Sequence, residues 1–81
     1  MANELHDLSI RITDAVKAEL ARRDLSGHDL VAPLGLGRNA VYARLRHERP
    51  FDTAELEKIV RFLGIDMTIL LASADLGAVA A

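Results

Sequence analysis

The sequence predicts an all-α protein, a compact bundle of about five short helices that forms a single domain over residues 1–81. Apolar residues recur every three or four positions along most of the chain, and no stretch shows the alternation typical of a strand. The 81 residues are 51% hydrophobic but only 4% aromatic, so aliphatic side chains must build the core. A chain of this length can bury one small core and cannot add a second domain for catalysis or ligand binding.

The first predicted helix runs to about Arg23. Its apolar stripe follows the three- and four-residue spacing and comprises Leu5, Leu8, Ile12, Val16 and Leu20. Such a stripe is expected to pack on the core. Glu19 and Arg23 lie four residues apart, which predicts an ion pair on the outer face of this helix.

Two shorter helices joined by a tight glycine turn are predicted between about residues 26 and 47. Ser26 is a good N-cap, and Asp29 can complete a variant of the capping box. Gly35 falls where the chain must turn, and a residue without a Cβ enters the left-handed region without steric cost. Pro33 lacks the N–H that a helix interior requires, so the first helix of the pair is expected to be short or kinked.

The second helix of this pair is predicted to begin after Gly37 and to bury Val41 and Leu45. Charge is distributed unevenly around it. Residues 38–49 include four arginines and one glutamate, whereas residues 52–81 include five acids and two bases, and the net charge is −2. A solvated helix face would explain the basic run taken alone. A basic segment on an acidic body is also the charge distribution of a surface that binds DNA.

The last third of the chain predicts two more helices. Asp52 caps the first of them, Glu55 completes its capping box, and Gly64 ends it. A short final helix is expected at about Met67 to Ala72. The tail, about residues 73–81, is small and weakly apolar, and it either frays or joins an oligomer contact.

A family resemblance rests on Leu30, Gly35, Leu36, Val41 and the run RLRHE at residues 44–48, followed by PFDTAELEKIVRFLGID. Over roughly residues 10 to 72 the chain resembles the helix-turn-helix proteins of the lambda-repressor/Cro-like (Xre) family, in particular short phage and actinobacterial regulators. The resemblance implies a lambda-repressor-like DNA-binding domain and a transcriptional regulator of the repressor or Cro type. Arg44 occupies a position often apolar in the family, so the second helix of the motif is expected to rotate slightly or end early.

The resemblance also implies where DNA would be contacted through the major groove of a palindromic operator. Base contacts fall at the start and outer face of the second helix, on Arg38, Asn39, Tyr42 and Ala43. Arginine pairs with guanine, asparagine with adenine, and an alanine methyl group meets that of thymine. For Tyr42, partial burial beside Leu45 is an alternative of equal weight. Phosphate contacts are expected from Ser26, Gly27, His28, Arg44, Arg46 and Arg49.

A homodimer is expected, at least on DNA, because one recognition helix discriminates too few base pairs to find a single site. Apolar residues for the contact follow the fourth helix, in a region without lysine or arginine. The candidates are Met67, Leu76 and Val79. Leu70 and Leu71 are expected instead to close the core of the monomer.

Catalysis is not expected, because no nucleophile lies near a base, no glycine-rich loop follows a strand and no paired acids frame a cleft. The chain has no cysteine, and its three histidines lie about twenty residues apart without the spacing of metal ligands. We therefore expect no metal, cofactor or small-molecule ligand.

A cytoplasmic protein is expected, because the N-terminal residues are polar and acidic and the apolar run Ile69 to Ala72 is too short to span a membrane. The alternative to a DNA-binding regulator is a protein-interaction module, an antitoxin-like or regulatory partner built on the same helices.

Overall fold

The computed structural model describes the backbone of residues 3–80 and the side chains of residues 8–75. No strand occurs between residues 3 and 80, and the predicted all-α bundle is confirmed. The elements are α1 (Asn3–Arg22), the 3-10 helix η1 (Gly27–Leu30), α2 (Val31–Leu34), α3 (Arg38–Leu45), α4 (Thr53–Leu63) and α5 (Met67–Ala80).

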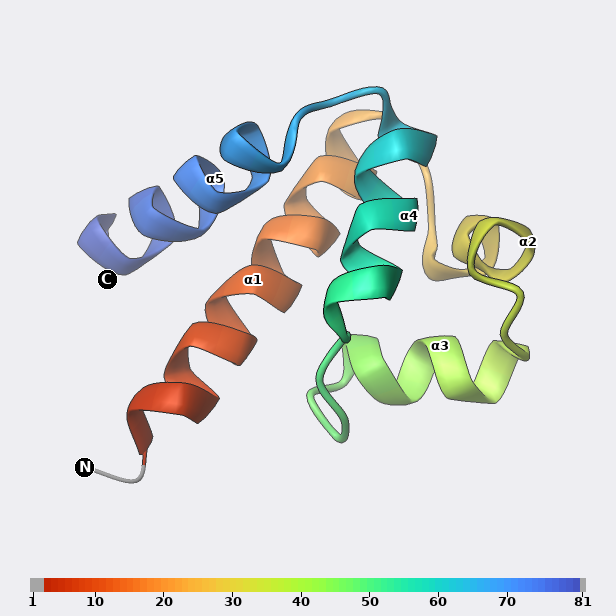
Figure 1. Ribbon diagram of the computed structural model, residues 1–81, viewed down its shortest axis with the longest axis horizontal. Coiled ribbons are helices and arrows are strands. Elements are labelled where there is room, and N and C mark those ends of the chain that lie inside the picture. Colours follow the sequence, from red (N-terminus) through yellow and green to blue (C-terminus); the bar gives the residue numbers. More distant parts are fainter. Residues whose placement is uncertain (1–2, 81) are drawn as a thin grey trace.

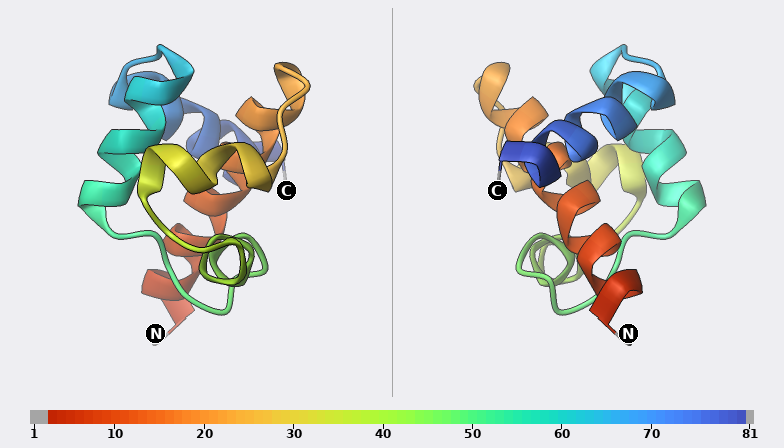
Figure 2. Two further views of the ribbon diagram at one scale, coloured as in Figure 1. Left: turned by 90° about the vertical axis from the view of Figure 1, so that its right-hand side faces the viewer. Right: turned by 90° about the vertical axis from the view of Figure 1, so that its left-hand side faces the viewer.

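The long helix α1 is the support on which the other helices are arranged (Figure 1). α5 packs along α1, and α4 contacts both of them. η1 packs against α3, and α2 packs against α4. α3 lies on the opposite side of the molecule from α5 (Figure 1). The segment η1–α2 and the helix α3 run in clearly different directions (Figure 2). The bundle therefore presents α3 at its surface and covers α1 with α5.

The core is aliphatic, as the composition predicts. Each helix and the 3-10 turn contribute to it, and the most deeply buried aliphatic side chain of each is Val16, Leu30, Leu34, Val41, Ile59 and Leu70. Burying one such side chain stabilises the folded state by about 1.5–3 kcal/mol. The seam predicted for α3, Val41 and Leu45, lies inside this core.

The ends of the helices follow the predicted local chemistry. Gly35 has φ +65° and Gly64 has φ +71°, so both glycines turn the chain in the left-handed region. At the start of α4, the Asp52 carboxylate accepts from the Glu55 N–H at 2.7 Å, and the Glu55 carboxylate accepts from the Asp52 N–H at 3.0 Å. This reciprocal capping box fixes the point at which α4 begins.

The segment containing Pro33 is short, as expected. A 3-10 turn, η1, leads into α2, which has four residues. Proline can occupy the first turn of a helix, where no intrahelical N–H is needed, and α2 does not extend beyond such a turn. Asp29 closes one half of the predicted capping box by accepting from the Ser26 N–H at 2.8 Å.

Three predictions about the long helices are wrong. α5 extends to Ala80 rather than ending near Ala72, since alanine favours helix and Ala74 is buried. In the apolar stripe of α1, Leu8 is 41% exposed, because it lies beyond the part of α1 that the core covers. Glu19 pairs with Arg23 but lies on the buried side of α1. The side chain of Leu5 lies outside the described residues.

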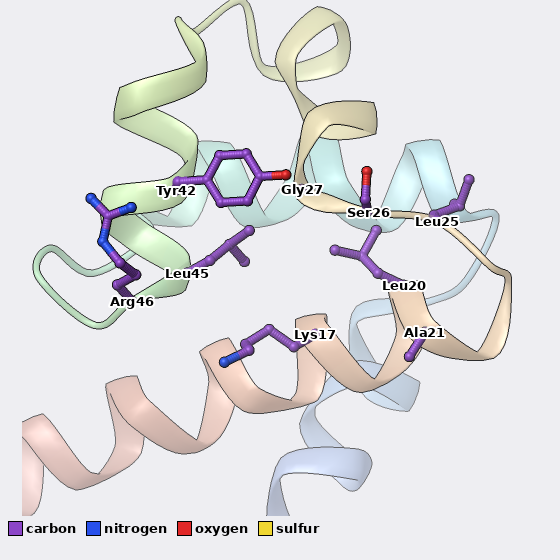
Figure 3. Close-up of a pocket in the computed structure, with 9 residues that line it drawn as sticks. All are labelled: Lys17, Leu20, Ala21, Leu25, Ser26, Gly27, Tyr42, Leu45 and Arg46. Atoms are coloured by element: carbon purple, nitrogen blue, oxygen red, sulfur yellow. The ribbon is translucent and has the colours of Figure 1, made fainter.

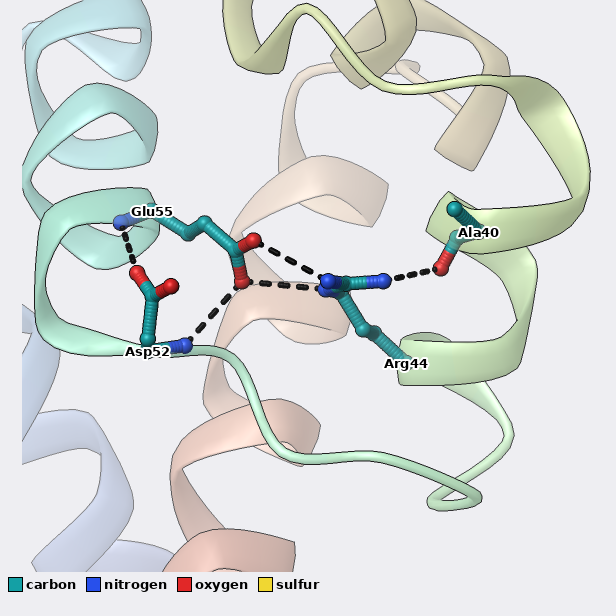
Figure 4. Close-up of polar contacts among 4 residues, drawn as sticks. All are labelled: Ala40, Arg44, Asp52 and Glu55. Carbon is teal, nitrogen blue, oxygen red and sulfur yellow. Dashed lines mark hydrogen bonds and ion pairs between the residues drawn. The ribbon is translucent and has the colours of Figure 1, made fainter.

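One buried ion pair fastens α3 to α4 (Figure 4). Arg44 donates from Nε to Glu55 Oε1 at 2.9 Å and from Nη2 to Glu55 Oε2 at 3.1 Å, while its Nη1 donates to the carbonyl of Ala40 at 2.9 Å. The two side chains are only 9% and 12% exposed. Because Glu55 also caps α4, the pair joins the end of one helix to the start of the next.

We expect Arg44→Met to destabilise the protein by about 3–5 kcal/mol, since the Glu55 carboxylate would remain buried without its partner. Glu55→Gln keeps an acceptor for the Asp52 N–H but loses the charge that Arg44 needs. The double variant should therefore lose clearly less than the sum of the two single losses. Urea unfolding followed by circular dichroism measures all three.

Arg46→Met is the matched control, because Arg46 lies just after α3 and is exposed. It should leave the unfolding midpoint nearly unchanged. Equal midpoints for Arg44→Met and Arg46→Met would show that the ion pair does not hold α3 in place.

Candidate nucleic-acid interface

The start of α3 is an accessible part of the predicted motif. Gly37 precedes the helix in an extended conformation, and Arg38 and Asn39, the first two residues of α3, are both exposed. Val41 and Leu45, which lie about one and two turns after Arg38, are buried. α3 is thus anchored by its later turns and presents a guanidinium and an amide group from its first turn.

Tyr42 is half-buried, in agreement with the alternative prediction of partial burial beside Leu45. Its ring packs on Gly27 so closely that a Cβ at position 27 would lie 3.0 Å from Tyr42 Cζ and 2.5 Å from Leu45 Cδ1. The guanidinium carbon of Arg38 lies 5.6 Å from the centroid of the Tyr42 ring, within the range of a cation–π contact. Tyr42 therefore supports Arg38 from one turn away. Ala43 is also half-buried.

Arg44 is not a phosphate contact, contrary to the prediction. Its side chain is buried, and its guanidinium nitrogens donate to Glu55 and to the carbonyl of Ala40. Releasing it to a phosphate would leave the Glu55 carboxylate buried without a counter-charge. α3 ends at Leu45, and Arg44 and Leu45 are both buried.

The start of η1 offers less to an anion than predicted. Ser26 and His28 are exposed, but Gly27 is buried against Tyr42 and Leu45 and has no surface for a phosphate. The Ser26 N–H already donates to the Asp29 carboxylate. That carboxylate places a negative charge where a phosphate would have to approach. Of the groups predicted to contact a phosphate here, only His28 and the Ser26 hydroxyl are accessible.

Arg46 and Arg49 are exposed beyond the end of α3. Arg46 Nε donates to Glu48 Oε2 at 2.7 Å. This hydrogen bond, with the attraction between the charges, raises the pKa of Arg46 and lowers the pKa of Glu48. Both groups stay charged at neutral pH, and a phosphate approaching Arg46 must compete with Glu48.

A contact that was not predicted follows α3. His47 has φ +67°, and its Nε2 lies 3.1 Å from Asp14 Oδ1 on α1. One signal was available: residues 40–50 contain no glycine or asparagine, and histidine enters the left-handed region, which often ends a helix, more readily than most residues.

Met67, Leu76 and Val79 were the residues predicted to form a dimer contact. Met67 is half-buried and packs against the core, while the side chains of Leu76 and Val79 lie outside the described residues. Leu70 is fully buried, as expected, but Leu71 is 42% exposed rather than part of the core. Ile69 is 49% exposed on the same helix. α5 therefore carries exposed apolar surface that the prediction had placed farther along the chain.

Within the described residues, no group of three or more histidine, aspartate or glutamate side chains is placed to hold a metal ion. None of the described helices has both the length and the apolar character required to cross a bilayer.

Comparisons with known proteins were made at the level of families, individual sequences and structures. A scan against protein-family models, a search of curated proteins and a search of solved structures each return no match to this chain.

Proposed function

We propose that this protein is a sequence-specific DNA-binding transcriptional regulator, of the repressor or Cro type, in which η1–α2 and α3 act as a helix-turn-helix. The observation that carries the proposal is the geometry of α3. Its inner face is fixed by Val41, Leu45 and the Arg44–Glu55 pair, while Arg38 and Asn39 project from its first turn. An α-helix held in this way fits the major groove, with its N-terminal residues at the base edges.

The charges on the surface support the same orientation. Arg38, Arg46 and Arg49 are exposed on or just after α3. α5 has no lysine or arginine and lies on the opposite side of the molecule (Figure 1). Phosphates would attract the α3 side, so the protein would meet DNA in one orientation.

Arg38 and Asn39 are the residues that we propose contact bases. Arginine can form two hydrogen bonds to guanine and asparagine two to adenine, and each such pair discriminates by about 1–3 kcal/mol. Tyr42 contributes mainly by supporting Arg38, and the half-buried Ala43 offers a methyl group at most.

We expect Arg38→Ala and Asn39→Ala each to relax base preference at one position of the operator, at a cost of about 1–3 kcal/mol. Arg49→Ala should instead weaken binding to every sequence. It should also reduce the slope of log affinity against log salt by about 0.9, the value for one phosphate contact. Selection from a random DNA pool, followed by titration at several salt concentrations, measures both effects.

The controls separate base contacts from a general loss of charge. Arg61→Ala removes one arginine from α4, outside the proposed interface, and should change neither base preference nor the salt slope. The assignment of base contacts is wrong if Arg38→Ala and Asn39→Ala lower affinity for operator and random DNA equally.

The protein acts on DNA, in this proposal, as a two-fold dimer that pairs through α5. Leu71 supplies exposed apolar surface on a helix without basic residues, which suits contact with an identical copy. Binding to successive major grooves of a palindromic site requires the α3 helices of the two copies to lie about 34 Å apart.

We expect Leu71→Asp to abolish cooperative binding to a palindromic site, with a loss of about tenfold or more in affinity. Binding to an isolated half-site should not change, because Leu71 is exposed in the monomer. Phe62→Asp on α4 is the matched control, since Phe62 is also 42% exposed. Full-affinity binding of a single subunit to the half-site would exclude the dimer.

The same exposed apolar residues are the observation that favours the second candidate function, a protein-interaction module. Ile69, Leu71 and Phe62 could meet another protein rather than a second copy. The salt dependence of binding to nonspecific DNA separates the two functions. A steep dependence favours the regulator, while an adaptor that contacts only proteins should show none.

A further inference from the structure

A recess lies between the last turns of α1 and the end of α3, closed on one side by residues 25–27 (Figure 3). Its volume is about 340 Å³. Leu20 and Leu45, both buried, form an apolar floor, and the ring of Tyr42 forms a wall. The recess is open to solvent and thus leaves apolar surface uncovered next to α3.

The rim of the recess is cationic and carries hydroxyl groups. Lys17 and Arg46 extend at the same end of it, and the hydroxyl of Tyr42 points toward the loop at Ser26 and Gly27 (Figure 3). None of the residues that line the recess is acidic. Lys17 makes no hydrogen bond or ion pair within the described part of the chain, so its charge is available to an occupant.

An apolar floor beneath the ammonium group of Lys17, the guanidinium of Arg46 that is paired with Glu48, and a hydroxyl donor suits a ligand with a carbon framework and an anionic group. A deoxyribose–phosphate unit has this chemistry, with sugar C–H groups on one side and a charged phosphate on the other. Tyr42 and Arg46 line the recess and belong to α3 and the residue after it. A duplex in contact with α3 would therefore bring its backbone to this recess.

We propose that the recess is a binding site for one sugar–phosphate unit of the DNA backbone, with Lys17 as the main contact to the phosphate. This inference rests on the proposed function and extends the interface from α3 to α1. Lys17 lies on α1, far in sequence from the predicted motif, so its position gave no sign of this role.

The test compares the only two lysines of the chain, Lys17 and Lys58. Lys58 is also exposed, but it lies on α4 and does not line the recess. Lys17→Ala and Lys58→Ala remove the same charge from a helix, and alanine favours helix at both positions, so both variants should fold. Affinity for a duplex of random sequence is measured for the wild type and both variants over a range of salt concentrations.

We expect Lys17→Ala to weaken binding and to reduce the salt slope by about 0.9, the value for one phosphate contact. When salt rises from about 50 to 200 mM, the affinity of the wild type should then fall by a factor roughly 3.5 times larger than the factor for the variant. Lys58→Ala should keep the slope of the wild type. Identical slopes for the two variants would overturn the inference, whereas a wild type that does not bind DNA at all would overturn the proposed function itself.

A second measurement distinguishes the DNA backbone from a free anion as the source of the ligand. Free 2-deoxyribose 5-phosphate and the duplex are each titrated into the wild type, while the amide resonances of Gly27 and Leu45 are followed by NMR. Saturating shifts with the duplex, but not with the free sugar phosphate at the same concentration, support the backbone site. Saturation by the free sugar phosphate, together with equal duplex binding by the two lysine variants, would assign the recess to a free anion and overturn the proposal.

Discussion

The orientation of α3 depends on the buried ion pair between Arg44 and Glu55. α3 has only eight residues, too few for a helix that is stable by itself in water. Its apolar contribution to the core is small, so packing alone gives it a limited anchor. The guanidinium of Arg44 reaches both oxygens of Glu55, and that carboxylate also fixes the first turn of α4. The direction in which Arg38 and Asn39 project is therefore set by a polar contact on the far side of the same helix.

Local features of the fold were predictable from the sequence because their causes are local. A left-handed glycine ends a helix wherever it occurs, and Asp52 with Glu55 forms a capping box over four residues. The exposure of Arg38 and Asn39 also follows from sequence, since both come directly after Gly37 and before the buried Val41.

The features that the sequence did not reveal are those that depend on distant elements. Arg44 and Glu55 are eleven residues apart, and neither position signals that the other is near or that both are buried. Gly27 looked like an accessible helix start, but the ring of Tyr42 covers it, and this close approach has no local signature. The exposure of Leu71 and the extension of α5 likewise depend on how much of α5 meets α1, which periodicity alone does not specify.

The residues that hold α3 in the core differ from the residues proposed to contact bases, and this separation affects how the protein could evolve. Val41, Arg44 and Leu45 are constrained by the core, whereas Arg38 and Asn39 have few packing obligations. Substitutions on the outward face could therefore accumulate with little penalty to folding. A lineage built on this scaffold and acting as proposed could change the DNA sequence that it binds while the bundle beneath α3 stayed the same.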